Sequence, residues 1–286
     1  MIPAYWPGGA VAKPSRGAVI RVRRLNLFLK GNLDLRDSLH SLRLNGTVCW
    51  NGLGGLLRDR FSGIHCRLLH ETWTRSDALL AADGTIPVEL TQRPLPLGAY
   101  SPASQFSQAM FTAPVDAVIL SIQPDTMSNL LRHRTQGYLL HADNPWEWPQ
   151  AEQDWLRASF DPIPRLEVAD SMANLERIIE RRRQFSDAPI LIYNQSPVVP
   201  GEAIDCHMGL ENIFSTRVRR FNLGLIELSQ RTGVSIIDVD SILSRHGAES
   251  LKIDALHLNA DGCRRVAEEV VRVLDDLGCL SDAQVA

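Results

Sequence analysis

Asp254 and His257, near the C-terminal end of the chain, are a carboxylate and an imidazole at a spacing that suits acid–base chemistry. Three residues apart, both side chains lie on one side of a tight loop or helical turn, where the carboxylate can hold one ring nitrogen and leave the other free as a base. A plainer alternative is that Asp254 caps the helix that follows and His257 packs against it. The secondary-structure elements around the pair indicate whether its role is catalysis or helix capping.

The pair lies in a predicted connection between a strand and a helix. Residues 234–239 form an apolar run typical of a buried strand, and residues 263–277 have the apolar spacing of an amphipathic helix. In open α/β sheets, ligands bind at such connections, outside the carboxyl ends of the strands. The location of Asp254 and His257 therefore favours a functional site.

Short apolar runs bounded by turn signals predict five strands, which begin near residues 22, 64, 115, 189 and 234. Helices are predicted over residues 33–42, 168–185, 214–232 and 263–277, with a short helix that ends at Arg60. Strands that alternate with helices indicate a parallel sheet covered on both faces. We therefore predict a three-layer α/β/α sandwich of flavodoxin-like type around a five-stranded parallel sheet.

Polar side chains follow each predicted strand, at residues 32–38, 71–75, 123–125, 194–196 and 254–257. Because the carboxyl ends of parallel strands meet at one edge of a sheet, all five segments are expected to converge there. Core packing alone gives no reason for polar residues to gather at one edge. The convergence therefore predicts a binding or catalytic site.

Three segments do not follow the strand and helix pattern. Residues 1–18 are rich in Pro and Gly and are expected to form an irregular arm. Residues 83–112 and 127–164 show little periodicity and are interpreted as cap-like insertions in a single domain over residues 19–286. Aromatic and proline residues at 144–149 either line a substrate pocket or form the core of the cap.

Composition excludes several classes of protein. The 286 residues are 44% apolar and 22% charged, with a net charge of −3, so neither nucleic acid nor an anionic membrane is expected as a partner. Five cysteines without metal-type spacing predict free thiols in a reducing compartment, and the N-terminus has no secretory pattern. We expect a cytoplasmic protein without a metal or an organic cofactor, and the sequence leaves its oligomeric state open.

The segment from Asp254 to Gly262, Asp-Ala-Leu-His-Leu-Asn-Ala-Asp-Gly, resembles the last block of the SGNH, or GDSL-like, hydrolase superfamily. Phe221-Asn222 and the following residues 233–238 resemble the segment before that block, and the resemblance spans residues 22–277. It implies a hydrolase, esterase or acyltransferase that acts on a small or carrier-bound acyl ester, thioester or amide. In that family the Asp and His complete a triad with a serine.

The resemblance leaves two registers open for the nucleophile. Gly31-Asn32-Leu33 directly follows the first strand and would put Leu33 at the serine position, whereas Asp37-Ser38-Leu39 matches by its letters. In the second register Ser38 would attack, His257 would act as general base and acid, and Asp254 would orient His257. The alternative is a protein without a serine nucleophile, in which His257 activates water or which only binds its ligand.

The resemblance also suggests residues that would hold the oxyanion. Gly52 resembles the glycine of the second block, whose small size lets a backbone amide approach the anion. Asp125 stands where the family has an Asn, and an ionised Asp would repel an oxyanion. Either Asp125 is protonated, or Gln123 or Asn51 supplies the donor, or the chain no longer performs ordinary ester hydrolysis. Asn32 either belongs to a modified site or caps a helix.

Overall fold

The computed structural model describes residues 23–40, 42–44, 47–50, 52–202, 213–281 and 284–285. The arm predicted over residues 1–18 lies outside the described residues, and so does Asn51. Along the described residues, no helix is both long enough and apolar enough to cross a membrane.

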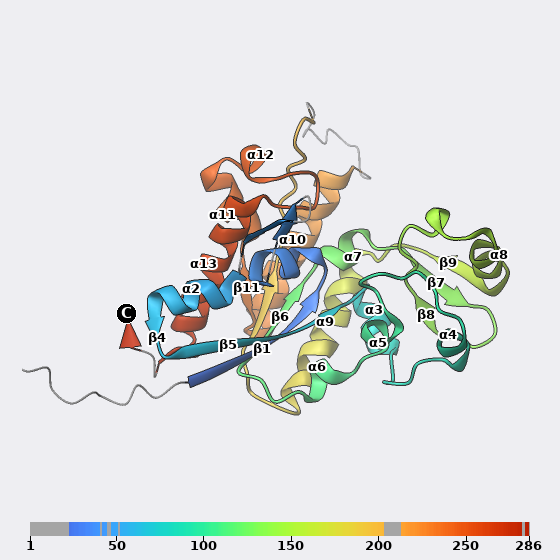
Figure 1. Cartoon of the computed structure of the whole chain (residues 1–286), viewed down its shortest axis with the longest axis horizontal. Helices are drawn as coiled ribbons and strands as arrows, with labels where there is room; N and C mark the ends of the chain where they lie inside the picture. The colour runs from blue at the N-terminus through green and yellow to red at the C-terminus, as the bar shows by residue number, and fades with distance from the viewer. Residues whose placement is uncertain are drawn as a thin grey trace, which may run out of the picture.

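A five-stranded parallel sheet forms the centre of the molecule, in the order β11-β10-β6-β1-β5 (Figure 1). Its strands are β1 (Arg23–Gly31), β5 (Ile64–Thr72), β6 (Ala117–Ser121), β10 (Ile190–Tyr193) and β11 (Ser235–Ile237). Each begins within two residues of its predicted start, so the predicted sheet is confirmed. The order places β1 and β6 near the centre, where both faces are covered.

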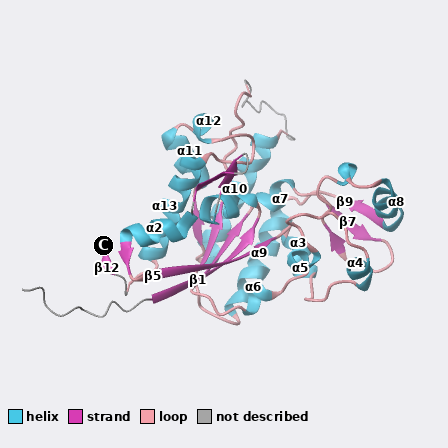
Figure 2. Cartoon of the chain, viewed as in Figure 1, coloured by secondary structure: helices cyan, strands magenta, loops and turns pink. Residues whose placement is uncertain are grey.

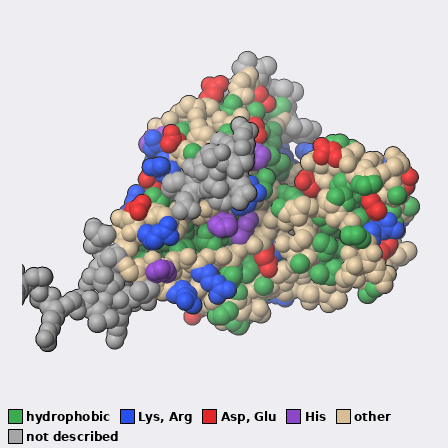
Figure 3. Space-filling view, viewed as in Figure 1, with side chains coloured by type: hydrophobic (Ala, Val, Ile, Leu, Met, Phe, Trp, Pro, Cys, Tyr) green, Lys and Arg blue, Asp and Glu red, His purple; other side chains and the backbone are tan. Residues whose placement is uncertain are grey.

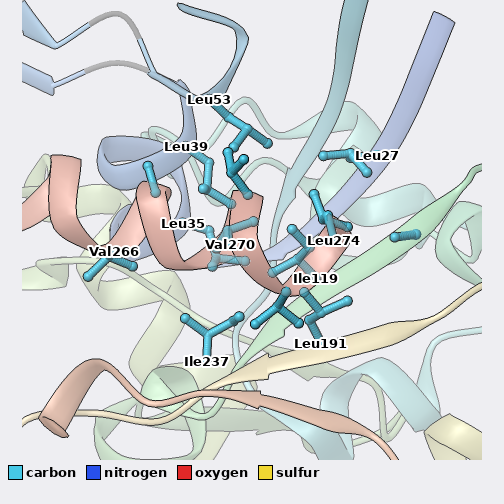
Figure 4. Close-up of a cluster of buried hydrophobic side chains, with 14 of the residues drawn as sticks. Leu27, Leu35, Leu39, Leu53, Ile119, Leu191, Ile237, Val266, Val270 and Leu274 are labelled. Atoms are coloured by element: carbon cyan, nitrogen blue, oxygen red, sulfur yellow. The ribbon is translucent and has the colours of Figure 1, made fainter. Parts of the chain in front are cut away.

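Helices cover both faces of the sheet, which confirms the three-layer α/β/α sandwich (Figure 2). Alternate residues of a strand point to opposite faces. Leu27 therefore packs in one core with α2 (Gly52–Arg60), α11 (Val239–His246) and α13 (Ala260–Asp276), as Figure 4 shows for Leu27, Val270 and Leu274. Phe28 packs in the other core with α9 (Val168–Arg183) and α10 (Phe214–Thr232).

The two predicted insertions pack together as a cap lobe, drawn at the right of Figure 1. The second insertion contains a small antiparallel sheet in the order β8-β7-β9. Seven buried side chains from both insertions form a core separate from those of the main sheet: Leu90, Leu97, Phe106, Leu140, Trp148, Leu156 and Phe160. The strands of the cap were not predicted because each has only two to four residues, too few to show the alternation of apolar and polar residues that is typical of a strand.

The remaining elements are short. In the cap they are α4 (Val88–Gln92), α5 (Pro102–Gln105), β7 (Leu130–His133), β8 (Leu139–Leu140), η2 (Pro145–Glu147), α8 (Gln150–Ser159) and β9 (Phe160–Ile163). The end of the first insertion, α6 (Ala109–Thr112), packs instead in the core of the main sheet through Met110 and Phe111. Elsewhere they are α1 (Leu33–Leu35), η1 (Arg36–His40), β2 (Leu42–Leu44), β3 (Thr47–Trp50), β4 (Phe61–Ser62), α3 (Ser76–Ala81), α7 (Gln123–Met127), α12 (Ala248–Leu251) and β12 (Gln284–Val285).

Two predicted helices differ from the structure at their ends. Residues 33–40 form one short α-turn, α1, followed by the π-helical turn η1, rather than a continuous α-helix. The last helix, α13, begins at Ala260 rather than at 263, because the side chain of Asn259 accepts a hydrogen bond from the amide of Gly262 and caps the helix three residues earlier.

Gly52 holds helix α2 directly against η1, and this contact generates a stability prediction. Gly52 has a φ of +71°, and a Cβ added there would lie 2.2 Å from the carbonyl oxygen of Leu39. We expect Gly52→Ala to lower the free energy of unfolding by about 2 kcal/mol or more, because both the backbone conformation and the contact become strained. Chemical denaturation measures the change.

Gly55 provides the matched control in the same helix. A Cβ at Gly55 would meet no atom within 4 Å, so Gly55→Ala should leave stability unchanged or raise it by up to about 1 kcal/mol. Equal effects of the two substitutions would show that the close approach of Gly52 to η1 is unimportant.

Candidate active site

A cleft with a volume of about 550 Å³ lies where the carboxyl ends of β1 and β6 face the cap lobe. In the space-filling view, the sheet body and the cap meet at a notch (Figure 3). The body contributes Asn32, Leu33, Asp34, Gln123, Leu256 and His257, and the cap side contributes Tyr100, Met127, Ser128, Asn129, Leu131, His141, Ala142, Asp143, Asn144, Pro145 and Trp146. Segments far apart in the sequence therefore meet in one cavity.

Asp254 binds His257 through both its ring and its backbone. Nδ1 of His257 lies 2.8 Å and 3.0 Å from the two carboxylate oxygens of Asp254, and the amides of Leu256 and His257 each donate to Oδ1 at 2.8 Å. Because a carboxylate only accepts, Nδ1 carries the hydrogen, and Nε2 of the neutral ring has a free lone pair. Nε2 has no hydrogen-bond partner within the described part of the chain, and His257 lines the cleft.

The carboxylate of Asp254 stays ionised next to the ring. Desolvation by itself would raise the pKa of Asp254, but the hydrogen bonds from the amides of His257 and Leu256 and the contact with the His257 ring outweigh it and leave the pKa below its ordinary value. A charged Asp254 can stabilise an imidazolium when His257 takes up a proton. The pair thus has the arrangement of a general base and its orienting carboxylate.

Lys252 anchors the loop that holds this pair. Its ammonium group is buried and donates to the carbonyl oxygens of Ser196 at 3.2 Å and Ala255 at 3.0 Å, and also to that of Val198. Burial is the main reason why the pKa of Lys252 falls to about 8, against the opposing charge of Asp254. The bonds tie the loop after β10 to the loop with Asp254 and His257.

Asp34 lies at the base of the cleft, directly after β1. Its Oδ1 accepts from the amides of Asn32 at 3.2 Å and Leu35 at 2.8 Å, and its Oδ2 accepts from the hydroxyl of Ser121 at the end of β6. Desolvation raises the pKa of Asp34 to about 6, although these hydrogen bonds partly counteract it. The carboxyl therefore changes its charge close to neutral pH.

Two amide side chains of the cleft have unused hydrogen-bonding groups. The backbone amide of Leu33 and the hydroxyl of Tyr100 both bind one side-chain atom of Asn32, at 2.9 Å and 2.6 Å. Since a backbone N–H only donates, that atom is Oδ1, and Nδ2 has no partner among the described residues. The side chain of Gln123 likewise has no partner there, and it lines the same cleft. Asn32 thus both caps α1 and contributes to the cleft.

The structure does not bring Ser38 into the lining of the cleft. Ser38 lies in η1 with 1% of its surface exposed, and its hydroxyl donates to the carbonyl of Asp34 at 2.6 Å and contacts the hydroxyl of Tyr193 at 3.3 Å. Leu33, the residue at the other register, does line the cleft together with His257. The two registers predicted from the sequence therefore correspond to a buried serine and to a cleft-facing leucine.

Gly52 and Asp125 also lie away from the cleft lining. Gly52 packs against the backbone of Leu39 and His40. Asp125 is buried, and its carboxylate accepts from the amide of Ser76 at 2.6 Å and the hydroxyl of Ser171 at 2.5 Å. Desolvation raises the pKa of Asp125 to about 6. Both residues thus fix neighbouring elements in the positions that the structure describes.

Several residues of the cleft were not among the predicted site residues. Tyr100, Ser128 and Asp143 come from the cap side, and Ser121 binds Asp34 from 87 positions away. No local spacing connects these residues, because the fold alone brings them together. Within the described ranges, no group of three or more His, Cys, Asp or Glu side chains is arranged to hold a metal ion, and Cys66, Cys263 and Cys279 are free thiols.

No family model matches the chain, and no curated protein matches it by sequence. Among solved structures it is similar to Axe2, an acetylxylan esterase from Geobacillus stearothermophilus (13% identity, 87% of this chain and 93% of that chain, TM-score 0.47). It is also similar to an extracellular lipase from Streptomyces rimosus (10%, 87% and 99%, 0.46) and to a lipolytic G-D-S-L family protein from Veillonella parvula (12%, 88% and 98%, 0.44).

The chain resembles the SGNH hydrolases in its fold. The likeness concerns the fold alone, with identities of 10–13% and TM-scores of 0.44–0.47.

The raised pKa of Asp34 predicts a pH-dependent contribution to stability. Because the folded state raises this pKa from 3.8 to about 6, the protonated carboxyl favours folding. The stabilisation is complete below about pH 4 and is lost as the pH rises through 6, by up to about 3 kcal/mol in total. Relative to Asp34→Asn, the free energy of unfolding of the unmodified protein should therefore fall between about pH 4 and 7.

Denaturant unfolding of both proteins across this pH range measures the difference. Asp125 is present in both proteins, so its own titration cancels. Replacing the exposed Asp83 by Asn is the control. The difference in free energy of unfolding between this variant and the unmodified protein should not change with pH. If the difference in free energy of unfolding for Asp34→Asn is also independent of pH, the carboxyl of Asp34 is not desolvated.

Proposed function

We propose that this protein is a hydrolase or acyltransferase that acts on a small acyl ester, thioester or amide, free or on a carrier, in the cleft beside His257. One observation carries the proposal: a histidine held through Nδ1 by Asp254 presents, in a cleft, an Nε2 without a partner among the described residues, and Asn32 and Gln123 offer side-chain amide groups there that are likewise without a described partner. A base next to hydrogen-bond donors is the combination that acyl transfer requires.

In the proposed reaction, Nε2 of His257 takes a proton from a water molecule or an acceptor hydroxyl as its oxygen attacks the acyl carbon. The carbonyl π electrons move to the carbonyl oxygen, and Nδ2 of Asn32 and the amide of Gln123 donate to this oxyanion. As the intermediate collapses, the bond to the leaving group breaks and His257 returns the proton to it. Asp254 keeps the ring oriented and stabilises the imidazolium.

The positions of Leu33 and Ser38 support attack by water or an external hydroxyl, without a covalent enzyme intermediate. Leu33 lines the cleft but has no nucleophilic atom. The hydroxyl of Ser38 is buried and donates to a backbone carbonyl. This hydroxyl also contacts the hydroxyl of Tyr193 at 3.3 Å. A serine becomes a nucleophile when a base within ~3 Å takes its proton.

Removing His257 should abolish the reaction without unfolding the protein. We expect His257→Ala to lower kcat for p-nitrophenyl acetate by about 10²- to 10⁴-fold, the range for loss of a general base. The thermal midpoint should change little, because the His257 side chain is 32% exposed and leaves no core cavity. The matched control is His246→Ala, which removes an exposed histidine from α11 and should leave kcat unchanged.

The outcome against this proposal is a His257→Ala variant that unfolds, or one that keeps full activity. In the first case Asp254 and His257 would only stabilise the loop before α13. If neither the unmodified protein nor any variant converts the acyl compounds that it binds, the chain is a binding protein that has the fold but no catalytic activity.

Ser38→Ala tests the identity of the nucleophile. We expect it to retain kcat within about threefold, because the proposed attack uses no enzyme hydroxyl. Mass analysis after treatment with a fluorophosphonate ester should find no adduct on Ser38 in the unmodified protein. An adduct on Ser38, together with loss of activity in Ser38→Ala, would instead favour the serine mechanism implied by the family resemblance.

A further inference from the structure

The cap side of the cleft contains a carboxylate and an aromatic ring that the proposed reaction does not use. Asp143, between β8 and η2, and Trp146, in η2, both line the cleft. Trp146 is 70% exposed, although large apolar side chains are more stable when buried. The carboxylate of Asp143 has no hydrogen bond or ion pair with any described residue, so it is available to a ligand.

The charges around the cleft are negative. Asp34 and Asp143 line it, and no Lys or Arg of the described residues does. The nearby Arg36 is paired with Asp37 at 2.6 Å. Desolvation is the main reason why the pKa of Tyr100 rises to about 12, and the charges of Asp143 and Asp34 add to it. The negative charges of both carboxylates therefore act on the phenol of Tyr100 and contribute to its raised pKa.

Polar groups without partners show that the cleft is suited to a polar ligand. Gln123 and Ser128 are more than nine-tenths buried, and their side chains form no hydrogen bond with the rest of the described chain. Both residues line the cleft, where a ligand or water can reach them. Their polar groups are therefore free to bind water or a polar ligand in the cleft, as buried polar groups usually have a partner of one of these kinds.

We propose that the cap side of the cleft is a subsite for a cationic ammonium group, held by the carboxylate of Asp143 and the indole face of Trp146. This ligand is a substrate only if the proposed function holds, whereas its binding does not depend on the reaction. The ammonium group belongs to the alcohol or acyl part of the ester whose carbonyl carbon is next to His257.

A cation fits these groups better than an anionic or an uncharged ligand. An anion would enter a cleft lined by two carboxylates and by no Lys or Arg of the described residues, and it would be repelled. An uncharged ligand that covered Asp143 would desolvate its carboxylate without compensating charge. A cation compensates that charge and is also attracted to the electron-rich face of an indole, the aromatic ring that binds cations best.

Two esters of the same shape test the charge alone. Acetylcholine carries a quaternary ammonium, and in 3,3-dimethylbutyl acetate a carbon replaces the nitrogen. We expect kcat/KM to be at least about tenfold higher for acetylcholine. The ratio should fall several-fold in Asp143→Asn and in Trp146→Leu, and it should also fall as salt screens the charges.

Glu147→Gln is the matched control for charge removal. Glu147 is exposed, follows Trp146 directly and does not line the cleft, so its neutralisation should leave the ratio unchanged. Equal kcat/KM for the two esters in the unmodified protein would overturn the proposal. A ratio that falls as much in Glu147→Gln as in Asp143→Asn would also overturn it, because general surface charge would then explain the preference.

Calorimetric titration of choline and of 3,3-dimethylbutanol separates this inference from the proposed reaction. Selective binding of choline that is lost in Asp143→Asn supports the subsite. If such binding is found but neither ester is hydrolysed, the proposed function is wrong and the subsite is still supported. Turnover of both esters without preference leaves the proposed function intact and removes the subsite. Choline that does not bind the unmodified protein more tightly than its uncharged analogue overturns the subsite in every case.

Discussion

Strands that run parallel must all end at the same edge of a sheet, and the cleft depends on this constraint. Asp34 follows β1, Gln123 follows β6, and His257 lies in the connection after β11, yet all three line one cavity. Strands β1, β6 and β10 are buried on both faces, mainly by leucine, isoleucine and phenylalanine side chains, which fixes their register. Polar chemistry is therefore confined to the ends of strands, where the apolar cores stop.

Two buried ionisable groups connect this edge to the rest of the fold. Asp34 joins the end of β1 to Ser121 of β6, and Lys252 joins the loop of His257 to the carbonyls after β10. Each group loses hydration on burial, which explains both the raised pKa of Asp34 and the lowered pKa of Lys252. Neither is left without partners, so their hydrogen bonds offset part of this cost and hold the loops in one arrangement.

The sequence predicts the strands of the main sheet well because short apolar runs bounded by turn signals indicate buried strands directly. The pairing of Asp254 with His257 also follows from local spacing. The contacts of Asn32 with Tyr100 and of Asp34 with Ser121 span 68 and 87 positions, so no periodicity encodes them. The π-turn after Leu35 was missed for another reason, since helical spacing over eight residues does not distinguish an α-helix from a wider turn.

The cap lobe has its own buried core, and this separates the choice of ligand from the chemistry. Leu140 and Trp148, on either side of Asp143 and Trp146 in the sequence, belong to that core, so the segment with Asp143 and Trp146 is positioned by the core of the cap. Asp254 and His257 are instead positioned by the loop that Lys252 anchors to the main sheet. Substitutions on the cap side can therefore change which group the cleft accepts without moving the base that acts on it.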